Sequence, residues 1–177
     1  NTLFEYKNAL TLIKAFDKIK DQIPHFLVFK GKKTDFWENT IVPYVQLHDL
    51  QSRIILIDRI LSEEELSYLY HHADVFVSPS RLEGFGLTPV EAAICGVPVI
   101  CSDIDTLNET TLGLVNYFNP NDENKLAELM VDLVRKPPIN LKEISQKLKS
   151  LYSVTEQAKK YAKLFETYED NSSHSHL

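Results

Sequence analysis

Short apolar runs of strand length, separated by helix-length segments, constrain the fold of this sequence most. Four runs follow one another along the chain: HFLVFKG at 25–31, RIILIDRI at 53–60, ADVFVSPS at 73–80 and VPVICSD at 97–103. A strand that is apolar throughout needs cover on both faces, and parallel strands need crossover helices. The pattern predicts an α/β fold, a Rossmann-like three-layer sandwich with a parallel sheet.

Helices are predicted between these strands. Segment 7–20 is amphipathic, and its apolar face consists of Leu10, Ile13, Phe16 and Ile19. Segment 35–50 predicts a second helix, in which we expect a kink or an early break at Pro43. Segment 62–72 predicts a third, because Ser62 and Glu65 have the spacing of a capping box, with Leu61 and Leu66 as its hydrophobic staple.

The last third of the sequence predicts one strand and mostly helices. VNYFN at 115–119 is typical of an edge strand, and helices are expected at 122–135, 140–150 and 153–169. Ser153 and Glu156 form a second capping-box pattern at the start of the last helix. KPP at 136–138 is expected to separate the sheet from a helical appendage, and the polar tail 169–177 is expected to be disordered.

The totals favour one globular domain without affinity for nucleic acid. The chain has 177 residues, 44% apolar, and its acidic residues exceed the basic ones by six. Cys95, Cys101 and the histidines lack metal or redox spacing, so we expect no protein-bound metal. No segment has the pattern of a signal peptide or a bilayer-spanning run, so we expect a cytoplasmic protein. Because NTLFEYKN lacks methionine and looks like the end of a strand, we expect an excised piece of a longer polypeptide.

The loop and helix after the third apolar run contain three of the chain's five glycines, at positions 84, 86 and 96. We expect Thr88 to be the N-cap of this helix and Pro89 its first residue, with Gly96 and Pro98 ending it. Free amides and the helix dipole favour an anion at such an N-terminus, and Gly84 and Gly86 leave the backbone open to a phosphate or a sugar. A tight turn alone is the competing interpretation of these glycines.

Two carboxylates frame this loop, Glu83 within it and Glu91 in the helix, with seven residues between them. Carboxylates accept hydrogen bonds from hydroxyl groups, so they suit sugar rings beside a phosphate site. Two alternatives stay open on the residues alone. Glu91 has capping-box spacing from Thr88, and Glu83 fits a solvated loop residue.

The segment ADVFVSPSRLEGFGLTPVEAAICGVPVICSDI at 73–104 resembles the signature of the group 1 family of retaining, nucleotide-sugar-dependent glycosyltransferases. The likeness combines the paired glutamates, both loop glycines and the closing CGVPV. FEYKN, LSEEELSYLYHHAD and YFNPNDENKLAELM extend it over about residues 3–135. The family has a two-domain GT-B fold, and the resemblance implies that this chain is its C-terminal, donor-binding half.

The resemblance implies two catalytic residues. Lys7 matches the family's phosphate-binding lysine, and a cation there stabilises the charge that builds on the leaving diphosphate. A solvated lysine at a helix start is the alternative interpretation. Glu83 lies against the transferred sugar in the family, and we assign it to sugar positioning and charge stabilisation instead of a covalent intermediate.

The resemblance also implies a set of donor-binding residues. Glu91 falls on the ribose-binding glutamate, backbone amides of the loop hold the diphosphate, and a threonine hydroxyl adds to them. These residues are Glu91, Gly84, Phe85, Gly86, Leu87 and Thr88. The sequence departs from the family pattern at three places. Arg59 replaces a common glycine, the arginine that usually precedes the lysine is missing, and TLNETTLG at 106–113 lacks the double glycine of some members, so donor contacts there are unassigned.

The implied function is transfer of a hexose from a UDP- or GDP-type sugar to an acceptor hydroxyl in glycan, polysaccharide or glycolipid synthesis, with no cofactor. Residues 1–168 form the donor domain, and the acceptor glycan or lipid-linked sugar meets an N-terminal domain absent from this chain. The isolated domain is expected to be inactive, and the full-length protein to lie in the cytoplasm, with peripheral contact at the inner face of the membrane. Two alternatives remain. One is a non-catalytic nucleotide-sugar-binding or interaction module with the same half-fold. The other is an unrelated Rossmann-type dehydrogenase, but this sequence lacks the GxGxxG motif that such an enzyme carries after its first strand.

Overall fold

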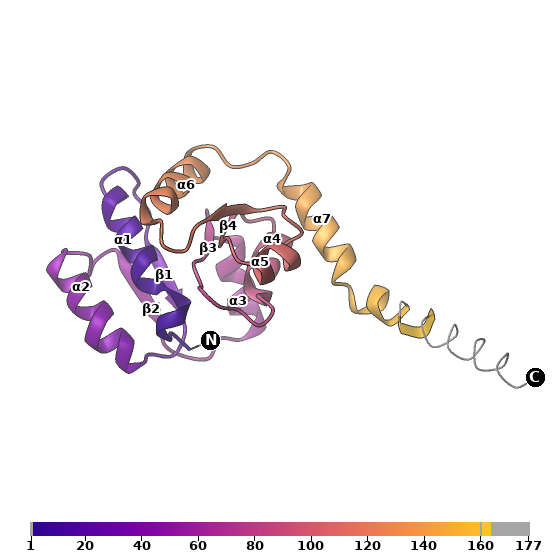
Figure 1. Ribbon diagram of the computed structural model, residues 1–177, viewed down its shortest axis with the longest axis horizontal. Coiled ribbons are helices and arrows are strands. Elements are labelled where there is room, and N and C mark those ends of the chain that lie inside the picture. The colour runs from indigo at the N-terminus through magenta and orange to yellow at the C-terminus, as the bar shows by residue number, and fades with distance from the viewer. Residues whose placement is uncertain (1, 160, 164–177) are drawn as a thin grey trace, which may run out of the picture.

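The computed structural model describes residues 2–159 and 161–163 (Figure 1). The strands are β1 (Leu27–Lys30), β2 (Ile54–Ile57), β3 (Phe76–Ser78), β4 (Val99–Ser102) and β5 (Asn116–Phe118). The helices are η1 (Glu5–Lys7), α1 (Ala9–Ile19), η2 (Trp37–Ile41), α2 (Val42–Leu47), α3 (Glu63–His71), α4 (Leu87–Ile94), α5 (Asp105–Thr110), α6 (Glu123–Arg135) and α7 (Leu141–Leu151). The predicted α/β class with parallel strands and intervening helices is confirmed.

The strands form two parallel sheets, where the sequence predicts one. β1 pairs with β2 in one sheet, and the order β3-β4-β5 makes the other. Figure 1 shows the two sheets apart from each other, with α1 beside the smaller one. The expected edge strand at 115–119 is confirmed, because β5 lies at the outer edge of the larger sheet.

One core cluster extends beneath both sheets. Ile13 and Phe16 of α1 are almost fully buried in it, together with Phe29 of β1, Ile100 of β4 and Leu126 of α6. α1 and α6 pack against each other along this layer. The amphipathic face predicted for segment 7–20 therefore faces the core, and it joins two sheets that share no strand pairing.

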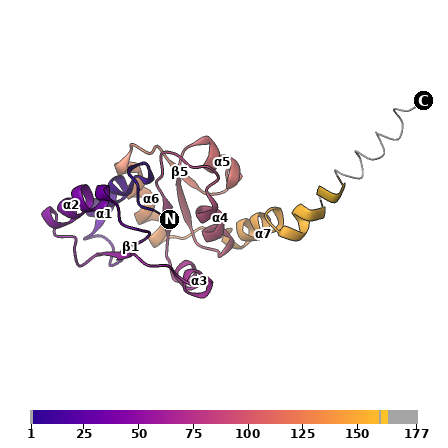
Figure 2. The ribbon, with the colours of Figure 1, turned by 90° about the horizontal axis from the view of Figure 1, so that it is seen from below.

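A second core cluster lies on the other face of the larger sheet. It contains Ala92 of α4, Val99 of β4, and Ile144 and Leu148 of α7. The Ser145 hydroxyl donates a hydrogen bond to the carbonyl of Ile94 at the end of α4. The segment expected to be a helical appendage thus covers the sheet with α7, and Figure 2 shows α7 beside α4 at the outer side of the body.

Local predictions for the helices hold in part. The capping box of α3 is confirmed, since Ser62 and Glu65 exchange side-chain and backbone hydrogen bonds. Pro43 does not break its helix. It lies at the start of α2, directly after the π-helix η2, and a wider π turn removes the clash that proline makes with the preceding carbonyl. Segment 105–110, for which the sequence analysis predicts no helix, forms α5.

The last predicted helix is described only in part. Residues 154–159 and 161–163 are helical. The remainder of that helix and the tail 169–177 lie outside the described residues. Among the described residues, no helix has both the length and the apolar character that crossing a bilayer requires.

Candidate active site

The loop after β3 leads directly into α4, but the helix begins earlier than the sequence predicts. Gly86 is the N-cap, with φ 78° and ψ 50°, and Leu87 is the first helical residue. Thr88 is therefore not the N-cap, and Pro89 occupies the third helical position instead of the first. Glycine reaches the left-handed region without strain, so it can turn the chain into the helix without a side-chain cap.

Gly86 also has a packing reason to be glycine, whereas Gly84 does not. A Cβ atom at Gly86 would clash with Cδ2 of Leu107, a fully buried residue of α5. A Cβ at Gly84 would meet no heavy atom within 4 Å. The backbone at Gly84 is thus open on its outer side, as a site for a bound phosphate or sugar requires, and Gly86 holds the loop against α5.

Lys7 and Glu83 lie in contact although 76 positions separate them in the sequence. The Lys7 Nζ atom is 2.8 Å from Oε1 and 3.0 Å from Oε2 of Glu83. The two side chains are 22% and 13% exposed, so the pair is largely shielded yet reachable from solvent. The pKa of the Cys101 thiol in β4 is raised to about 12, mainly by burial and to a smaller extent by the negative charge of Glu83. The two residues predicted to be catalytic are brought together.

Asn8 organises this part of the molecule, and the sequence analysis assigned it no role. Its backbone adopts the left-handed conformation, with φ 58°, and its side chain is buried. The amide nitrogen Nδ2 donates to the carbonyl of Pro79 at 3.0 Å and to that of Pro120 at 2.8 Å, and Oδ1 accepts from Thr11. Asn8 therefore connects the start of α1 to the chain beyond β3 and beyond β5, next to Lys7.

Glu91 enters a different hydrogen-bond pair. Its Oε2 atom accepts a hydrogen bond from the hydroxyl of Tyr70 on α3 at 2.8 Å. The pKa of the Tyr70 hydroxyl is raised above its usual range, mainly by burial and then by the hydrogen bond with Glu91. Tyr70 therefore keeps its proton and is the donor of this hydrogen bond. The capping box with Thr88 does not form, because α4 starts at Leu87. The sequence carries no signal for Tyr70 beyond its place in a helix.

The other predicted donor-binding residues lie in the loop and in the first turn of α4, and their side chains differ in exposure. Phe85 is 45% exposed and meets Tyr152 edge-on, with ring centroids 5.8 Å apart, and Leu87 is 59% exposed. Thr88 is partly buried in the first turn of α4. The amides of Gly86, Leu87 and Thr88 have no partner within the first turn of a helix, so they remain available to an anion.

Arg59 is engaged by its own neighbour. Its guanidinium lies 2.6 Å and 3.0 Å from the two carboxylate oxygens of Glu65, and this contact with Arg59, together with the Ser62 amide, lowers the pKa of Glu65 to about 2. The pair borders an apolar cavity of about 380 Å³ between β2 and α3 that Leu61 and Tyr68 also line. Arg59 thus lies at the rim of this cavity, with its guanidinium held by Glu65.

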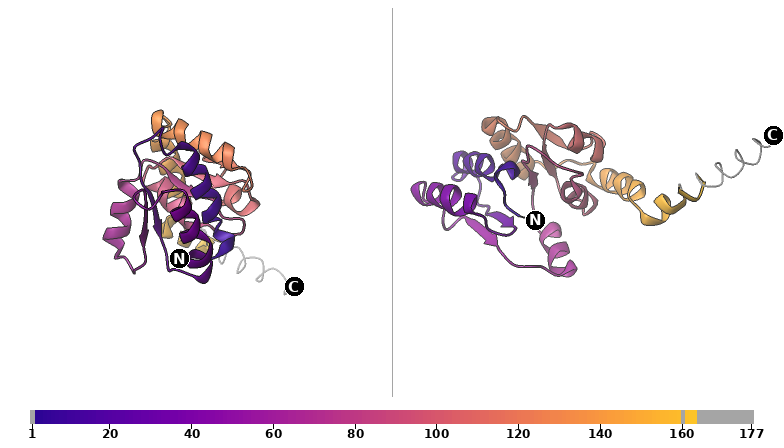
Figure 3. Two further views of the ribbon diagram at one scale, coloured as in Figure 1. Left: turned by 90° about the vertical axis from the view of Figure 1, so that its left-hand side faces the viewer. Right: turned by 60° about the horizontal axis from the view of Figure 1, so that its bottom comes forward.

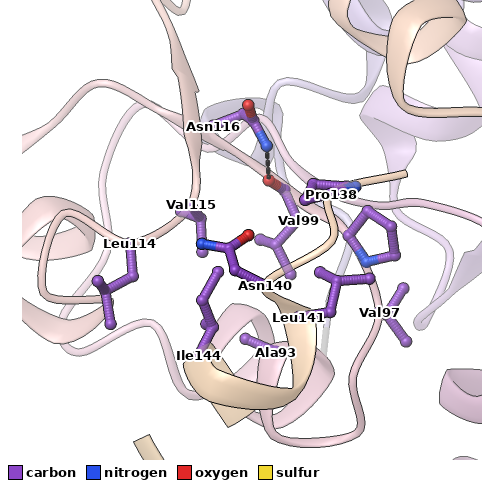
Figure 4. Close-up of a pocket in the computed structure, with 11 residues that line it drawn as sticks. Ala93, Val97, Val99, Leu114, Val115, Asn116, Pro138, Asn140, Leu141 and Ile144 are labelled. Atoms are coloured by element: carbon purple, nitrogen blue, oxygen red, sulfur yellow. Dashed lines mark hydrogen bonds between the residues drawn. The ribbon is translucent and has the colours of Figure 1, made fainter. Parts of the chain in front are cut away.

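A second cavity lies at the end of the larger sheet where its strands begin, opposite the end that leads into the loop 83–88. It has a volume of about 210 Å³ and lies where β4 and β5 begin, beside α4 and the start of α7. Figure 4 shows Asn116, which donates to the carbonyl of Val99, and Asn140 at its rim. Of these two cavities, neither is lined by Glu83 or Glu91. Within the described part of the chain, no group of three or more acidic, histidine or cysteine side chains has the arrangement of a metal site.

The fold matches that of GT-B glycosyltransferases. The protein Alr3699/HepE from Anabaena, solved in complex with UDP, superposes with a TM-score of 0.80 at 16% identity over 94% of this chain and 47% of its own. The C-terminal domain of a glycosyl transferase group 1 family protein, LpcC from Francisella tularensis, superposes with a TM-score of 0.69 at 22% identity, over 85% of this chain and 82% of its own.

Sequence comparison places the chain in a family. The family described as Glycosyl transferases group 1 matches residues 1–164, so the chain belongs to it. The O-antigen chain mannosyltransferase B of Escherichia coli is 32% identical over 128 residues, which are 71% of this chain and 33% of that protein. The chain thus spans about a third of the length of this curated relative.

Proposed function

We propose that this chain is the donor-binding, C-terminal half of a retaining glycosyltransferase that moves a hexose from a UDP- or GDP-type sugar to an acceptor hydroxyl. Family membership supports the transferase class, and similarity to an O-antigen mannosyltransferase favours an acceptor in polysaccharide synthesis. The acceptor site would belong to an N-terminal domain. On this proposal the isolated chain binds donor but transfers little or no sugar.

The contact between Lys7 and Glu83 carries the proposal. An ammonium has three N–H groups, and the two oxygens of Glu83 engage two directions around Nζ, which leaves donor capacity for a phosphate oxygen. Charge that develops on the departing diphosphate would then meet a cation already held in place, and this stabilises the transition state more than the ground state. Glu83 orients Lys7 and accepts from the hydroxyls of the transferred sugar.

Glu91 is proposed to bind the ribose. One of its oxygens accepts from Tyr70, and each carboxylate oxygen can accept more than one hydrogen bond, so a ribose diol can share it. The bond from Tyr70 fixes the rotamer of Glu91 before the donor arrives. Amides of Phe85, Gly86 and Leu87, with the hydroxyl of Thr88, would hold the diphosphate at the amino end of α4.

Calorimetric titration of the 177-residue chain with UDP, GDP and their sugars tests the proposal. We expect one of the two nucleotides to bind in the micromolar to millimolar range. Lys7→Ala and Glu91→Gln should each weaken that binding at least about tenfold, as loss of a charged hydrogen bond does. Lys18→Ala is the matched control, because Lys18 also forms an ion pair, at 2.8 Å with Glu123, away from the loop.

Absence of binding by every nucleotide and sugar at millimolar concentration contradicts the proposal. Equal losses in Lys7→Ala and Lys18→Ala contradict the assigned role of Lys7. An assay of donor hydrolysis with the complete polypeptide separates an enzyme from a binding module of the same half-fold. The complete enzyme is expected to work in the cytoplasm, in peripheral contact with the membrane that carries a lipid-linked acceptor.

A further inference from the structure

α7 lies along α4 and contacts the chain at both ends of that helix. In the first half of α7, the hydroxyl of Ser145 donates to the carbonyl of Ile94, at the carboxyl end of α4. Tyr152 is the C-cap of α7, and its ring meets the ring of Phe85 in the loop that leads into the amino end of α4. Figure 3, right, shows α7 in orange at the side of the larger sheet, with the yellow helical residues continuing beyond it.

The loop before α4 has few bonds of its own. Among the described residues, the amides of Gly84, Phe85 and Gly86 donate to no backbone carbonyl. The ion pair with Lys7 holds only the side chain of Glu83, at the start of the loop. Free amides bind an anion together only when they point toward the same place. The contacts that hold the loop therefore decide how well it can bind a phosphate.

Tyr152 contacts this loop in two ways. Its ring lies edge-on to that of Phe85, with centroids 5.8 Å apart and an angle of 79° between the ring planes, a favourable geometry for an aromatic pair. Its hydroxyl donates to the carbonyl of Thr110, the last residue of α5, at 2.8 Å. The Thr110 hydroxyl oxygen would lie 3.7 Å from a Cβ atom at Gly86. One side chain thus holds Phe85 directly and Gly86 through the end of α5.

The position of Tyr152 is itself fixed. Its amide donates to the carbonyl of Leu148 at 2.9 Å, and the side chain of Gln157 donates to the carbonyl of Leu151 at 2.6 Å. Burial, and then the negative charge of Glu109, raise the pKa of the tyrosine hydroxyl, so it keeps its proton and remains a donor. The ring also packs against the second core cluster. A ring held in this way can restrain a half-exposed neighbour.

We propose that Tyr152 is a positioning residue for the donor diphosphate, a role that rests on the function proposed above. It holds Phe85 and the end of α5, so that the amides of residues 85–87 point toward one place before a donor arrives. A loop that adopts this arrangement only a tenth of the time binds about tenfold more weakly. The ribose is held from the other side, by Glu91 and its bond from Tyr70, so its binding does not depend on Tyr152.

NMR relaxation of the 177-residue chain without ligand tests the positioning step. Tyr152→Leu removes the ring contact and the hydroxyl bond, and Tyr152→Phe removes the hydroxyl bond alone. In Tyr152→Leu the amides of Phe85 and Gly86 should become more mobile, with order parameters below about 0.6 or exchange broadening that the parent chain lacks. In Tyr152→Phe they should stay close to the parent values.

Tyr44→Leu is the matched control. Tyr44 also has one hydroxyl bond, to Asp17, and one ring partner, His48, but it packs against the other core cluster from α2. The motion of the loop 83–88 should be unchanged in this variant. Should Tyr152→Leu fail to fold, Phe85→Leu removes the same ring contact from a side chain that is 45% exposed, and it should have the same effects.

Calorimetric titration of the same variants with UDP, GDP, uridine and guanosine tests the consequence for the diphosphate. Tyr152→Leu should bind the preferred diphosphate about tenfold more weakly than the parent chain, and the matching nucleoside within about twofold. Tyr152→Phe should stay within about threefold for both, and Tyr44→Leu should match the parent chain. A general loss of structure weakens nucleoside and diphosphate alike, so the ratio of the two affinities isolates the positioning role.

Failure of the role of Tyr152 differs from failure of the proposed function. A parent chain that binds UDP or GDP, with a Tyr152→Leu variant that binds it equally well, overturns the role and leaves the function standing. Equal losses for nucleoside and diphosphate overturn the role, as does an unchanged loop in Tyr152→Leu. A parent chain that binds neither diphosphate contradicts the function and overturns the role with it, even where the loop becomes mobile.

Discussion

The two sheets of this molecule have similar sequences and very different surroundings. All four residues of β4, VICS, are buried, whereas β2, IILI, has no buried residue and leaves Ile55 44% exposed. β4 has α6 on one face, and α4 with α7 on the other. The β1–β2 sheet has α1 and η2 on one face. An apolar run therefore predicts a strand, but the layers around it decide how deeply the strand is buried.

The candidate site belongs to the better covered sheet. Glu83, Gly86 and Glu91 follow β3, and their loop is held by α5 and α3. Lys7 is the exception, since it reaches the site from the first residues of the chain. Functional groups on loops are positioned well when the scaffold below them is rigid. The larger sheet is thus the scaffold of the candidate site, and the β1–β2 sheet lies at its periphery.

Truncation of a central residue in each sheet tests the contrast directly and should have the largest effect. Ile100→Ala removes a fully buried side chain of β4 and should cost about 3–4 kcal/mol of unfolding free energy, since the cavity cannot collapse. Ile55→Ala, its matched partner in β2, should cost about 1 kcal/mol or less because the side chain is half in water already. Urea unfolding measures both. Equal costs would show that the sheets are equally covered.

Asn8→Ala should have the next largest effect, about 3 kcal/mol. It removes the hydrogen bonds to the carbonyls of Pro79 and Pro120 and the bond from Thr11, and it places alanine in the left-handed region. Asn8→Gly keeps that backbone conformation free of strain, so it should cost about 1 kcal/mol less. Urea unfolding of both variants separates the two contributions. If glycine costs as much as alanine, the backbone conformation contributes nothing.

The two loop glycines should respond differently to alanine. Gly86→Ala should cost about 2 kcal/mol, because its Cβ meets buried Leu107 and its φ is 78°. Gly84→Ala should change stability by less than about 0.5 kcal/mol, since nothing lies within 4 Å. Thermal unfolding measures the stability of each variant. A Gly84→Ala variant as unstable as Gly86→Ala would contradict the open backbone described here.

The smallest expected effect is a pH dependence of the unfolding free energy that arises from Asp17, whose carboxylate lies between α1 and α2. Burial alone would raise the pKa of Asp17, but hydrogen bonds with Lys20 and His48 outweigh it and lower the pKa below 3.8. A carboxylate with a lowered folded-state pKa stabilises the protein above its unfolded pKa, and this stabilisation is lost as the pH falls through the folded value. Asp17→Asn should therefore cost about 1 kcal/mol at about pH 7 and progressively less as the pH falls below 3.8. A constant difference across that range contradicts the assignment.

Local patterns explain which parts of the fold the sequence predicted. The capping box at Ser62 and the amphipathic face of α1 depend on neighbours a few residues apart, and both were predicted correctly. The start of α4 was wrong by two residues because Gly86 takes the place of a side-chain cap, and α5 was missed because segment 105–110 has mixed polarity. The division into two sheets depends on strand edges, which no local pattern describes.

The candidate site shows the same limit. Glu83 and Lys7 were proposed together from a family resemblance, and their contact spans 76 positions. Asn8 and Tyr70 were missed because they act through long-range hydrogen bonds, two for Asn8 and one for Tyr70, that are invisible in the sequence around them. The roles of Lys7, Glu83 and Glu91 toward a donor remain predictions, and the titrations described above test them.

The amide group of Asn8 has a mechanical consequence for the loops above the sheet. Its two hydrogens leave one nitrogen at a fixed angle, and each meets the carbonyl of a different proline. The segments at Pro79 and Pro120 are thereby kept at one separation, and neither can shift outward alone without losing its hydrogen bond to Asn8. A single planar amide thus fixes the distance between the segment that follows β3 and the segment that follows β5.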